Sequence, residues 1–218
     1  MLTGRQAHLA RGTAAAKRVD GRYGPFAALR DGGEEAQRDG AALPTGPGDE
    51  LWFIEPAAVA PLPGLKVART GVLSQMIAGE ATSPAEVADD EAVLLGEEHA
   101  AAMTALALAT RPGPWAELTR CYGSFYGIFR DGRLAAMAGE RMLPCPGVAE
   151  VSGICTWPEF RGAGLGRRLT QHVMATFRQR GDRPYLHSYA DNAAAIALYR
   201  SLGFRERRAM ILTVMMPA

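Results

Sequence analysis

Apolar and polar positions follow clear periods in the second half of the chain, from about residue 91 onward. Two segments rich in strand-forming residues, 124–130 and 133–140, flank the dipeptide Asp131-Gly132, which favours the tight turn of a hairpin. A further strand is predicted at 149–156. The pattern therefore predicts a β-hairpin followed by a third strand.

The period then changes from that of a strand to that of a helix. An apolar stripe that would face a sheet recurs every four residues, at Leu165, Leu169, Val173 and Phe177. A strand at 185–189 and a second helix at 192–202 come next, and Gly203 stands where a helix C-terminus favours glycine. A last strand is predicted at 205–215.

Weaker signals precede the hairpin. A short strand is predicted at 93–94, and an alanine-rich helix at 97–110 ends before Pro112-Gly113-Pro114. The predicted order is β-α-β-β-β-α-β-α-β. This alternation indicates a chain of the α/β (α+β) class.

The first part of the chain has less regular signals. Residues 32–49 predict a loop or a frayed helix, 51–55 a strand, and 65–76 a second strand or a strand running into a helix. We expect an N-terminal α+β extension at 1–85 and a larger domain at 86–218. The extension is interpreted as an appendage that covers apolar surface. The alternative is a degenerate half lobe related to the larger domain.

Composition limits the classes of function. Of 218 residues, 48% are hydrophobic and 22% charged, and the net charge of +1 gives no global argument for nucleic acid or a membrane surface. The three cysteines have no metal-ligand spacing and cannot all pair. Neither a leader pattern nor a membrane-spanning apolar run is found, so a cytoplasmic protein without a metal is expected.

The segment 161–168, Arg-Gly-Ala-Gly-Leu-Gly-Arg-Arg, carries the most specific chemistry. Three alternate glycines run directly into the predicted helix, whose first N–H groups lack intrahelical partners. Arg167 and Arg168 fall in the first turn, where a cation opposes the helix dipole. The segment is therefore predicted to bind an anion of the phosphate type, and a tight turn with solvated arginines is the structural alternative.

Two common phosphate loops do not fit this spacing. A Walker loop needs a lysine that is not present, and a dinucleotide fingerprint needs Gly-x-Gly-x-x-Gly where the chain has Gly162-x-Gly164-x-Gly166. Asp182 lies at about the right distance for a ribose contact, but it falls in a predicted turn. Both loops are disfavoured.

A third pattern, Arg161-x-x-Gly164-x-Gly166, resembles the pyrophosphate loop of the GNAT superfamily of N-acetyltransferases. The preceding 151–160 resembles that family's fourth strand, and 192–204 resembles its Asn-x-x-Ala-x-x-Leu-Tyr-x-x-x-Gly-Phe helix. The resemblance covers roughly residues 92–215. It implies a mixed, mostly antiparallel central sheet flanked by helices, and acetyl-coenzyme A as the acyl donor.

The resemblance also implies roles for individual residues. The donor's pyrophosphate would rest on Arg161, Gly162, Ala163, Gly164, Leu165, Gly166 and Arg167. Its pantetheine arm would pair with the backbone of Ile154, Cys155 and Thr156 and contact Asn192, which is also a natural helix N-cap. Tyr199 would be the general acid for the departing thiolate, with a half-buried packing tyrosine as the alternative.

The general base is less well defined by the sequence. Glu150, eleven residues before Arg161, occupies a spacing at which several family members place a glutamate base, and a solvated strand-end carboxylate is the alternative. Glu140 and His187 are rivals for the role. Cys155 is interpreted as a small buried residue rather than a nucleophile, because no activating base is evident.

The expected function is therefore direct transfer of an acetyl group from acetyl-coenzyme A to a primary amine. A catalytically inactive coenzyme A-binding module is the first alternative, and a nicotinamide-dependent oxidoreductase is the second. The acceptor stays open between a small molecule and a protein N-terminus or lysine. A homodimer is equally open.

Overall fold

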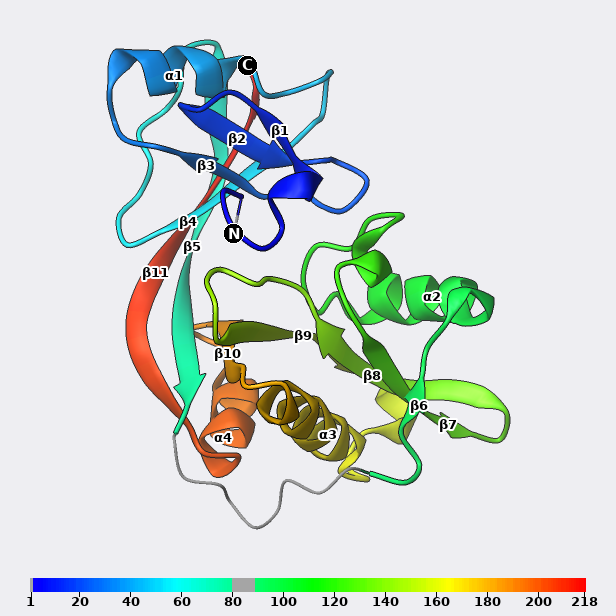
Figure 1. Cartoon of the computed structure of the whole chain (residues 1–218). Helices are drawn as coiled ribbons and strands as arrows, with labels where there is room; N and C mark the ends of the chain where they lie inside the picture. The colour runs from blue at the N-terminus through cyan, green and yellow to red at the C-terminus, as the bar shows by residue number, and fades with distance from the viewer. Residues whose placement is uncertain (1, 80–88) are drawn as a thin grey trace.

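The computed structural model describes residues 2–79 and 89–218, and these form one three-stranded and one eight-stranded sheet. The larger sheet has the order β4-β11-β5-β10-β9-β8-β7-β6 (Figure 1). Its strands are β4 (Leu51–Glu55), β5 (Leu65–Ala78), β6 (Val93–Leu94), β7 (Phe125–Arg130), β8 (Arg133–Glu140), β9 (Val148–Thr156), β10 (Arg183–Tyr189) and β11 (Phe204–Pro217). Of these neighbours only β9 and β10 run parallel within the described residues. The predicted mixed, mostly antiparallel sheet is confirmed.

Helices cover both faces of this sheet. They are α2 (Ala100–Thr110), α3 (Leu165–Gln179) and α4 (Ala193–Ser201), with short 3-10 turns η2 (Glu97–His99), η3 (Thr119–Cys121) and η4 (Pro158–Phe160). The predicted stripe of α3 is buried, with Leu169 and Val173 fully inaccessible, and it packs with α4 on one face. Helix α2 packs on the opposite face, against Phe125 and Met137. The four-residue period therefore located the buried side of α3 correctly.

The N-terminal part contains elements that periodicity did not predict. They are η1 (Ala7–Leu9), β1 (Ala10–Gly12), β2 (Ala16–Val19), β3 (Ala27–Leu29) and α1 (Glu34–Ala41). Strands of three or four residues are too short to display a two-residue period. Helix α1 lies where the sequence predicted a loop or a frayed helix.

Strands β4 and β5 join the large sheet although they come early in the chain. Strand β5 is fourteen residues long, pairs with β10 and β11, and does not run into a helix. Strands β5 and β11 extend from the main body to the N-terminal part, as Figure 1 shows. The boundary predicted between residues 85 and 86 lies outside the described residues, and the large sheet takes strands from both sides of it.

The parallel pair β9 and β10 opens into a fork. Residues 183–185 pair with residues 148–150. Beyond Glu150 and Tyr185 the two strands do not pair with each other within the described chain. The remaining part of each strand therefore presents unpaired backbone toward the other. Among residues 2–79 and 89–218, none of the helices combines the length and the hydrophobicity of a membrane-spanning segment.

Candidate active site

The glycine segment forms an open loop at the start of α3. Gly162 has φ +82° and Gly164, the N-cap, has φ +74°, which are left-handed values that favour glycine. Arg168 N donates to Gly164 O at 3.0 Å, so the N–H groups of Leu165 to Arg167 precede the first intrahelical bond of α3. A Cβ added at Gly162 or Gly164 would meet nothing within 4 Å. The loop thus has free donors and open space for an anion.

The arginines of this loop differ in what they contact. Arg161 Nε donates to Thr156 O at 3.3 Å and is exposed, whereas Arg167 Nη2 donates to Ser201 Oγ at 2.7 Å. Arg168 donates to both carboxylate oxygens of Asp89, at 2.5 and 2.7 Å. It also lies 3.1 Å from Glu91, and these carboxylates raise its pKa. Arg168 is therefore neutralised, whereas within residues 2–79 and 89–218 the side-chain contacts of Arg161 and Arg167 are to neutral oxygens.

A cavity of about 370 Å³ extends from this loop along the fork between β9 and β10. It brings together most of the predicted site residues: Glu150, Ile154, Cys155, Thr156, Arg161, Gly166, Asn192 and Tyr199. The other predicted loop residues, Gly162, Ala163, Gly164, Leu165 and Arg167, adjoin the cavity without lining it, and the Leu165 side chain is buried in the core. Residues predicted from separate motifs are thus joined in one hollow.

Tyr199 and Asn192 lie on the same side of α4. The Tyr199 side chain is buried against Phe204, with ring centroids 6.1 Å apart, and burial raises its pKa to about 12. Asn192 is the N-cap, and its Oδ1 accepts from Ala195 N at 3.1 Å. The phenol therefore stays protonated at neutral pH, and the cap fixes the start of the helix that carries it.

Glu150 is buried in a network of polar side chains rather than solvated at a strand end. Its Oε1 accepts from His187 Nδ1 at 2.9 Å, and its Oε2 lies 3.3 Å from Arg141 Nε. Burial opposes ionisation of this carboxyl, but Arg141 and His187 outweigh it and hold the pKa below its ordinary value. Glu150 is thus an ionised carboxylate with both oxygens occupied.

The other ring nitrogen of His187 has a defined partner too. His187 Nε2 lies 3.0 Å from Gln75 Nε2, and Arg207 Nη1 donates to Gln75 Oε1 at 2.6 Å. Because Arg207 needs the oxygen of Gln75, the amide nitrogen must face the imidazole. Neutral His187 therefore carries its proton on Nδ1, toward Glu150, and accepts from Gln75 at Nε2.

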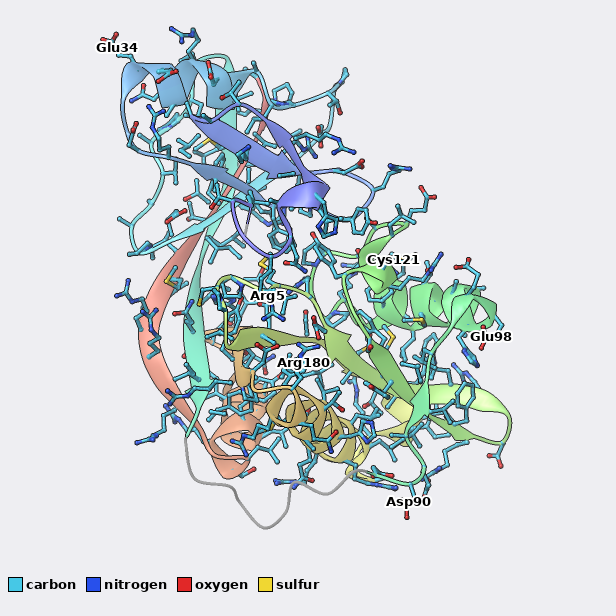
Figure 2. The ribbon with its side chains drawn as sticks, viewed as in Figure 1. Arg5, Glu34, Asp90, Glu98, Cys121 and Arg180 are labelled. Carbon is cyan, nitrogen blue, oxygen red and sulfur yellow. The ribbon has the colours of Figure 1, made fainter. Side chains whose placement is uncertain are left out.

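Glu140, a rival for the base, belongs to a structural cluster outside this cavity. Its Oε2 lies 2.5 Å from Arg180 Nη1, and Arg180 Nε donates to Asp182 Oδ2 at 2.6 Å. Arg5, in the N-terminal segment, contacts the same carboxylate, with its Nη1 2.8 Å from Asp182 Oδ1. Figure 2 labels Arg5 between the N-terminal part and β9, and Arg180 beside β9 and α3. This cluster fastens the N-terminal segment to the main body.

Cys155 lines the cavity but is not poised as a nucleophile. Its side chain is buried beside α2, and burial raises the pKa of its thiol to about 12. The sulfur is therefore protonated at neutral pH. In the part of the chain that the structure describes, no group of three or more His, Cys, Asp or Glu side chains could hold a metal ion.

Several residues of the site had no usable signal in the sequence. Arg141 and Gln75 hold Glu150 and His187 in place, and Phe26, Trp52 and Ile54 wall the cavity from the N-terminal side. They belong to segments of weak periodicity or to strand ends. Only the pairing of β4 and β5 with β11 and β10 brings most of them to the site.

Known proteins resemble the whole chain or its second half. Residues 125–212 match the family model described as FR47-like protein. A crystal structure described as an acetyltransferase from the GNAT family, from Novosphingobium aromaticivorans DSM 12444, is 52% identical, with a TM-score of 0.93 over 100% of this chain and 95% of that chain. The chain therefore belongs to the GNAT family of acetyltransferases.

Two further similarities are more distant or more local. The ribosomal protein bS18-alanine N-acetyltransferase of Escherichia coli (strain K12) is 37% identical over 99 residues, which cover 43% of this chain and 66% of that protein. The chain thus spans just under two thirds of the length of this curated relative. A GCN5-related N-acetyltransferase from Kribbella flavida has a TM-score of 0.61 and 21% identity over 97% of this chain and 91% of that chain, and shares the fold.

Proposed function

We propose that the chain transfers the acetyl group of acetyl-coenzyme A directly to a primary amine. One observation carries the proposal: a single cavity of about 370 Å³ touches the glycine loop, the open edge of β9, Tyr199 and the Glu150–His187 pair. A site for an anion, a site for an extended chain, a proton donor and a proton acceptor are thus in reach of one ligand. The family supports the same class of reaction.

The loop fits the pyrophosphate of the donor. The N–H groups of Leu165, Gly166 and Arg167 would bind its oxygens, and the guanidinium groups of Arg161 and Arg167 would add charge. The unpaired backbone of residues 154–156 would bind the amides of the pantetheine arm by strand addition. The thioester of the bound donor would then lie in the fork, near Glu150 and Tyr199.

Tyr199 is the proposed acid. Its phenol stays protonated and would donate to the sulfur as the C–S bond breaks, which stabilises the developing thiolate. The amine nitrogen forms the new C–N bond to the acetyl carbon and loses one proton to a base. The products are an N-acetylated amine and a free thiol, and the proton taken by the base replaces the one that Tyr199 gave, so atoms and charge balance over the cycle.

The Glu150–His187 pair is the proposed base. Both oxygens of Glu150 are occupied and its pKa is held low, so we assign the carboxylate to orienting His187 and balancing its charge. His187 would take the amine proton at Nε2, with the Gln75 amide moving aside. This is the arrangement in which a carboxylate fixes the tautomer of a histidine base.

Turnover of acetyl-coenzyme A over a panel of primary amines tests the proposal. Tyr199→Phe is expected to lower kcat by about a hundredfold or more while the Kd of coenzyme A stays unchanged, because the ring is retained. Tyr126→Phe, outside the cavity lining, is the matched control and should keep wild-type kcat. Binding of coenzyme A without turnover on any amine would instead support a binding module.

Glu150→Gln separates the roles within the base. If Glu150 positions His187, the variant should lower kcat and change the pH profile of kcat, with little effect on the Kd of coenzyme A. A variant with an unchanged pH profile would overturn the assignment of the pair.

A further inference from the structure

A second cavity, of about 500 Å³, lies beyond His187 on the side away from the glycine loop. It shares Phe26, Trp52, Ile54 and His187 with the cavity of about 370 Å³, which is called the donor cavity below. The two cavities therefore meet at the proposed base. Strands β2 and β3 of the small sheet form one wall, and β4, β10 and β11 contribute the other. A ligand in this second cavity would therefore reach His187 from the side opposite the donor.

The lining of this cavity is mainly apolar. Its larger apolar side chains are Leu2, Phe26, Leu29, Trp52, Ile54, Met142 and Met210, with several alanines between them. Its volume falls in the usual range for a small-molecule site, roughly 300–1,000 Å³. A ligand with a hydrophobic body would thus gain from burial here.

The charged groups of the lining argue against a polycation. Among its described residues, Glu55 is the one carboxylate, and burial raises the pKa of that group. Arg30 and Lys17 are cationic, although Arg30 is paired with Asp31 and Glu35. A polyamine would find a single carboxylate in the described lining for its several charges, and Lys17 opposes it.

A peptide acceptor fits the lining no better. Each peptide unit brings an N–H and a C=O that need partners when they leave water. Thr3 and Gln75 are the neutral polar side chains that the described lining offers besides His187 and Tyr185. An acceptor with few polar groups loses less hydration in such a site.

We propose that this cavity holds the body of the acyl acceptor, and that the acceptor is a small primary amine with an apolar body whose nitrogen reaches His187. The inference rests on the proposed acetyl transfer and names the substrate class. Its specificity would come from the N-terminal part of the chain, because β2, β3 and β4 lie outside the family-model match at residues 125–212. The enzyme would thus use a shared donor site with an added acceptor wall.

The N-terminal wall is fixed in place by specific contacts. Gln6, which is buried, donates to Arg141 O at 2.7 Å and accepts from Leu143 N at 2.9 Å. Arg5 is paired with Asp182 at 2.8 Å. The start of the chain, which contributes Leu2 and Thr3 to the lining, is therefore held by bonds to residues 141–143 and to Asp182, and a preformed cavity costs little ordering on binding.

Ala28→Phe on β3 tests the proposal by filling the cavity. Phenylbutylamine serves as the apolar amine, propylamine as a short amine and spermidine as a polycation. With the wild-type chain, kcat/KM should be at least about tenfold higher for phenylbutylamine than for either comparator. Ala28→Phe should remove that advantage and leave propylamine largely unaffected, while Ala101→Phe on the exposed face of α2 should change neither.

Two additions keep the test decisive. Ala14→Phe narrows the cavity at its exposed rim, so the same loss is expected even where Ala28→Phe does not fold. Titration calorimetry of phenylbutylamine with the coenzyme A-bound protein reads occupancy without turnover. Binding that Ala28→Phe or Ala14→Phe weakens, with no amine acetylated, would keep the cavity proposal and overturn the acetyl-transfer proposal. Acetylation that is equal for all three amines, or fastest for spermidine, would overturn the cavity proposal alone.

Discussion

Replacing Arg141 with methionine isolates the electrostatics of the proposed base. The Arg141 side chain is 13% exposed and Glu150 is 2% exposed, with Nε 3.3 Å from Oε2. Arg141→Met keeps an unbranched side chain about as long as the apolar stem of Arg141 and removes the guanidinium with its charge. Among the described residues, Glu150 then stays buried with His187 as its side-chain partner. Breaking a buried pair in this way costs roughly 3–5 kcal/mol.

The loss of folding free energy in Arg141→Met has a second, smaller contribution that does not depend on pH. Arg141 also lies over the ring of Phe26, 5.0 Å from the centroid, and such a contact contributes roughly 0.5–1 kcal/mol. For a chain of this size, a loss of about 3 kcal/mol lowers Tm by roughly 6–12 °C. Both contributions have the same sign at pH 7.

The pH dependence distinguishes the two contributions. In the wild type the pKa of Glu150 is lowered, so its stabilisation is present above the unfolded value of 4.5 and is lost as pH falls through the folded pKa. In Arg141→Met, burial is less opposed and the pKa of Glu150 should rise. The variant's deficit should then shrink as pH falls from 7 to 5, because the buried carboxylate is neutralised.

Urea unfolding followed by tryptophan fluorescence at pH 7 and pH 5 measures both quantities. The double variant Arg141→Met with Glu150→Gln should recover part of the lost stability at pH 7, since it carries no unpaired charge. A deficit below about 1 kcal/mol, or one that is equal at both pH values, would refute the reasoning.

Three further predictions concern the donor site. Gly164→Ala should lose roughly 1–2 kcal/mol of stability and weaken coenzyme A binding, whereas Gly181→Ala, with φ +84° and equally open space, should lose similar stability and keep the Kd. Cys155→Ala should retain turnover in a coupled thiol assay, since the buried thiol stays protonated; loss of kcat without loss of fold would favour an acetyl-cysteine route. Burial raises the pKa of Tyr199 to about 12, so Tyr199 should not lose its proton below about pH 10. Any fall of kcat between neutral pH and pH 10 should therefore also be measured in Tyr199→Phe. If that fall were absent from the variant, the role of Tyr199 as a protonated acid would be contradicted.

The elements of the second half could be predicted because their signals are local. The Asp131-Gly132 turn, the apolar stripe ending at Phe177 and the Asn192 cap each depend on residues within a few turns or one hairpin. The three short strands of the N-terminal part have no such signal. Their pairing depends on long-range contacts that no short window contains.

The residues of the candidate site likewise fall into a group that local sequence predicts and a group that it does not. The glycine loop and the face shared by Asn192 and Tyr199 were predictable, because helix geometry and left-handed glycines fix them over a few residues. The contact of Glu150 with His187, and of His187 with Gln75, could not be predicted. His187 follows Glu150 by 37 residues, and Gln75 precedes His187 by 112 residues.

The sequence by itself determined the proposed donor half of the site: an open loop at a helix N-terminus, a strand before it and a tyrosine on the next helix. Those features follow from backbone conformations that a few consecutive residues impose. The tertiary structure alone decided the proposed acceptor half, because β4 and β5 reach β11 and β10 from early in the chain and carry Trp52, Ile54 and Gln75 to His187. Strand pairing and burial over long separations assemble that half, and they depend on the whole chain at once.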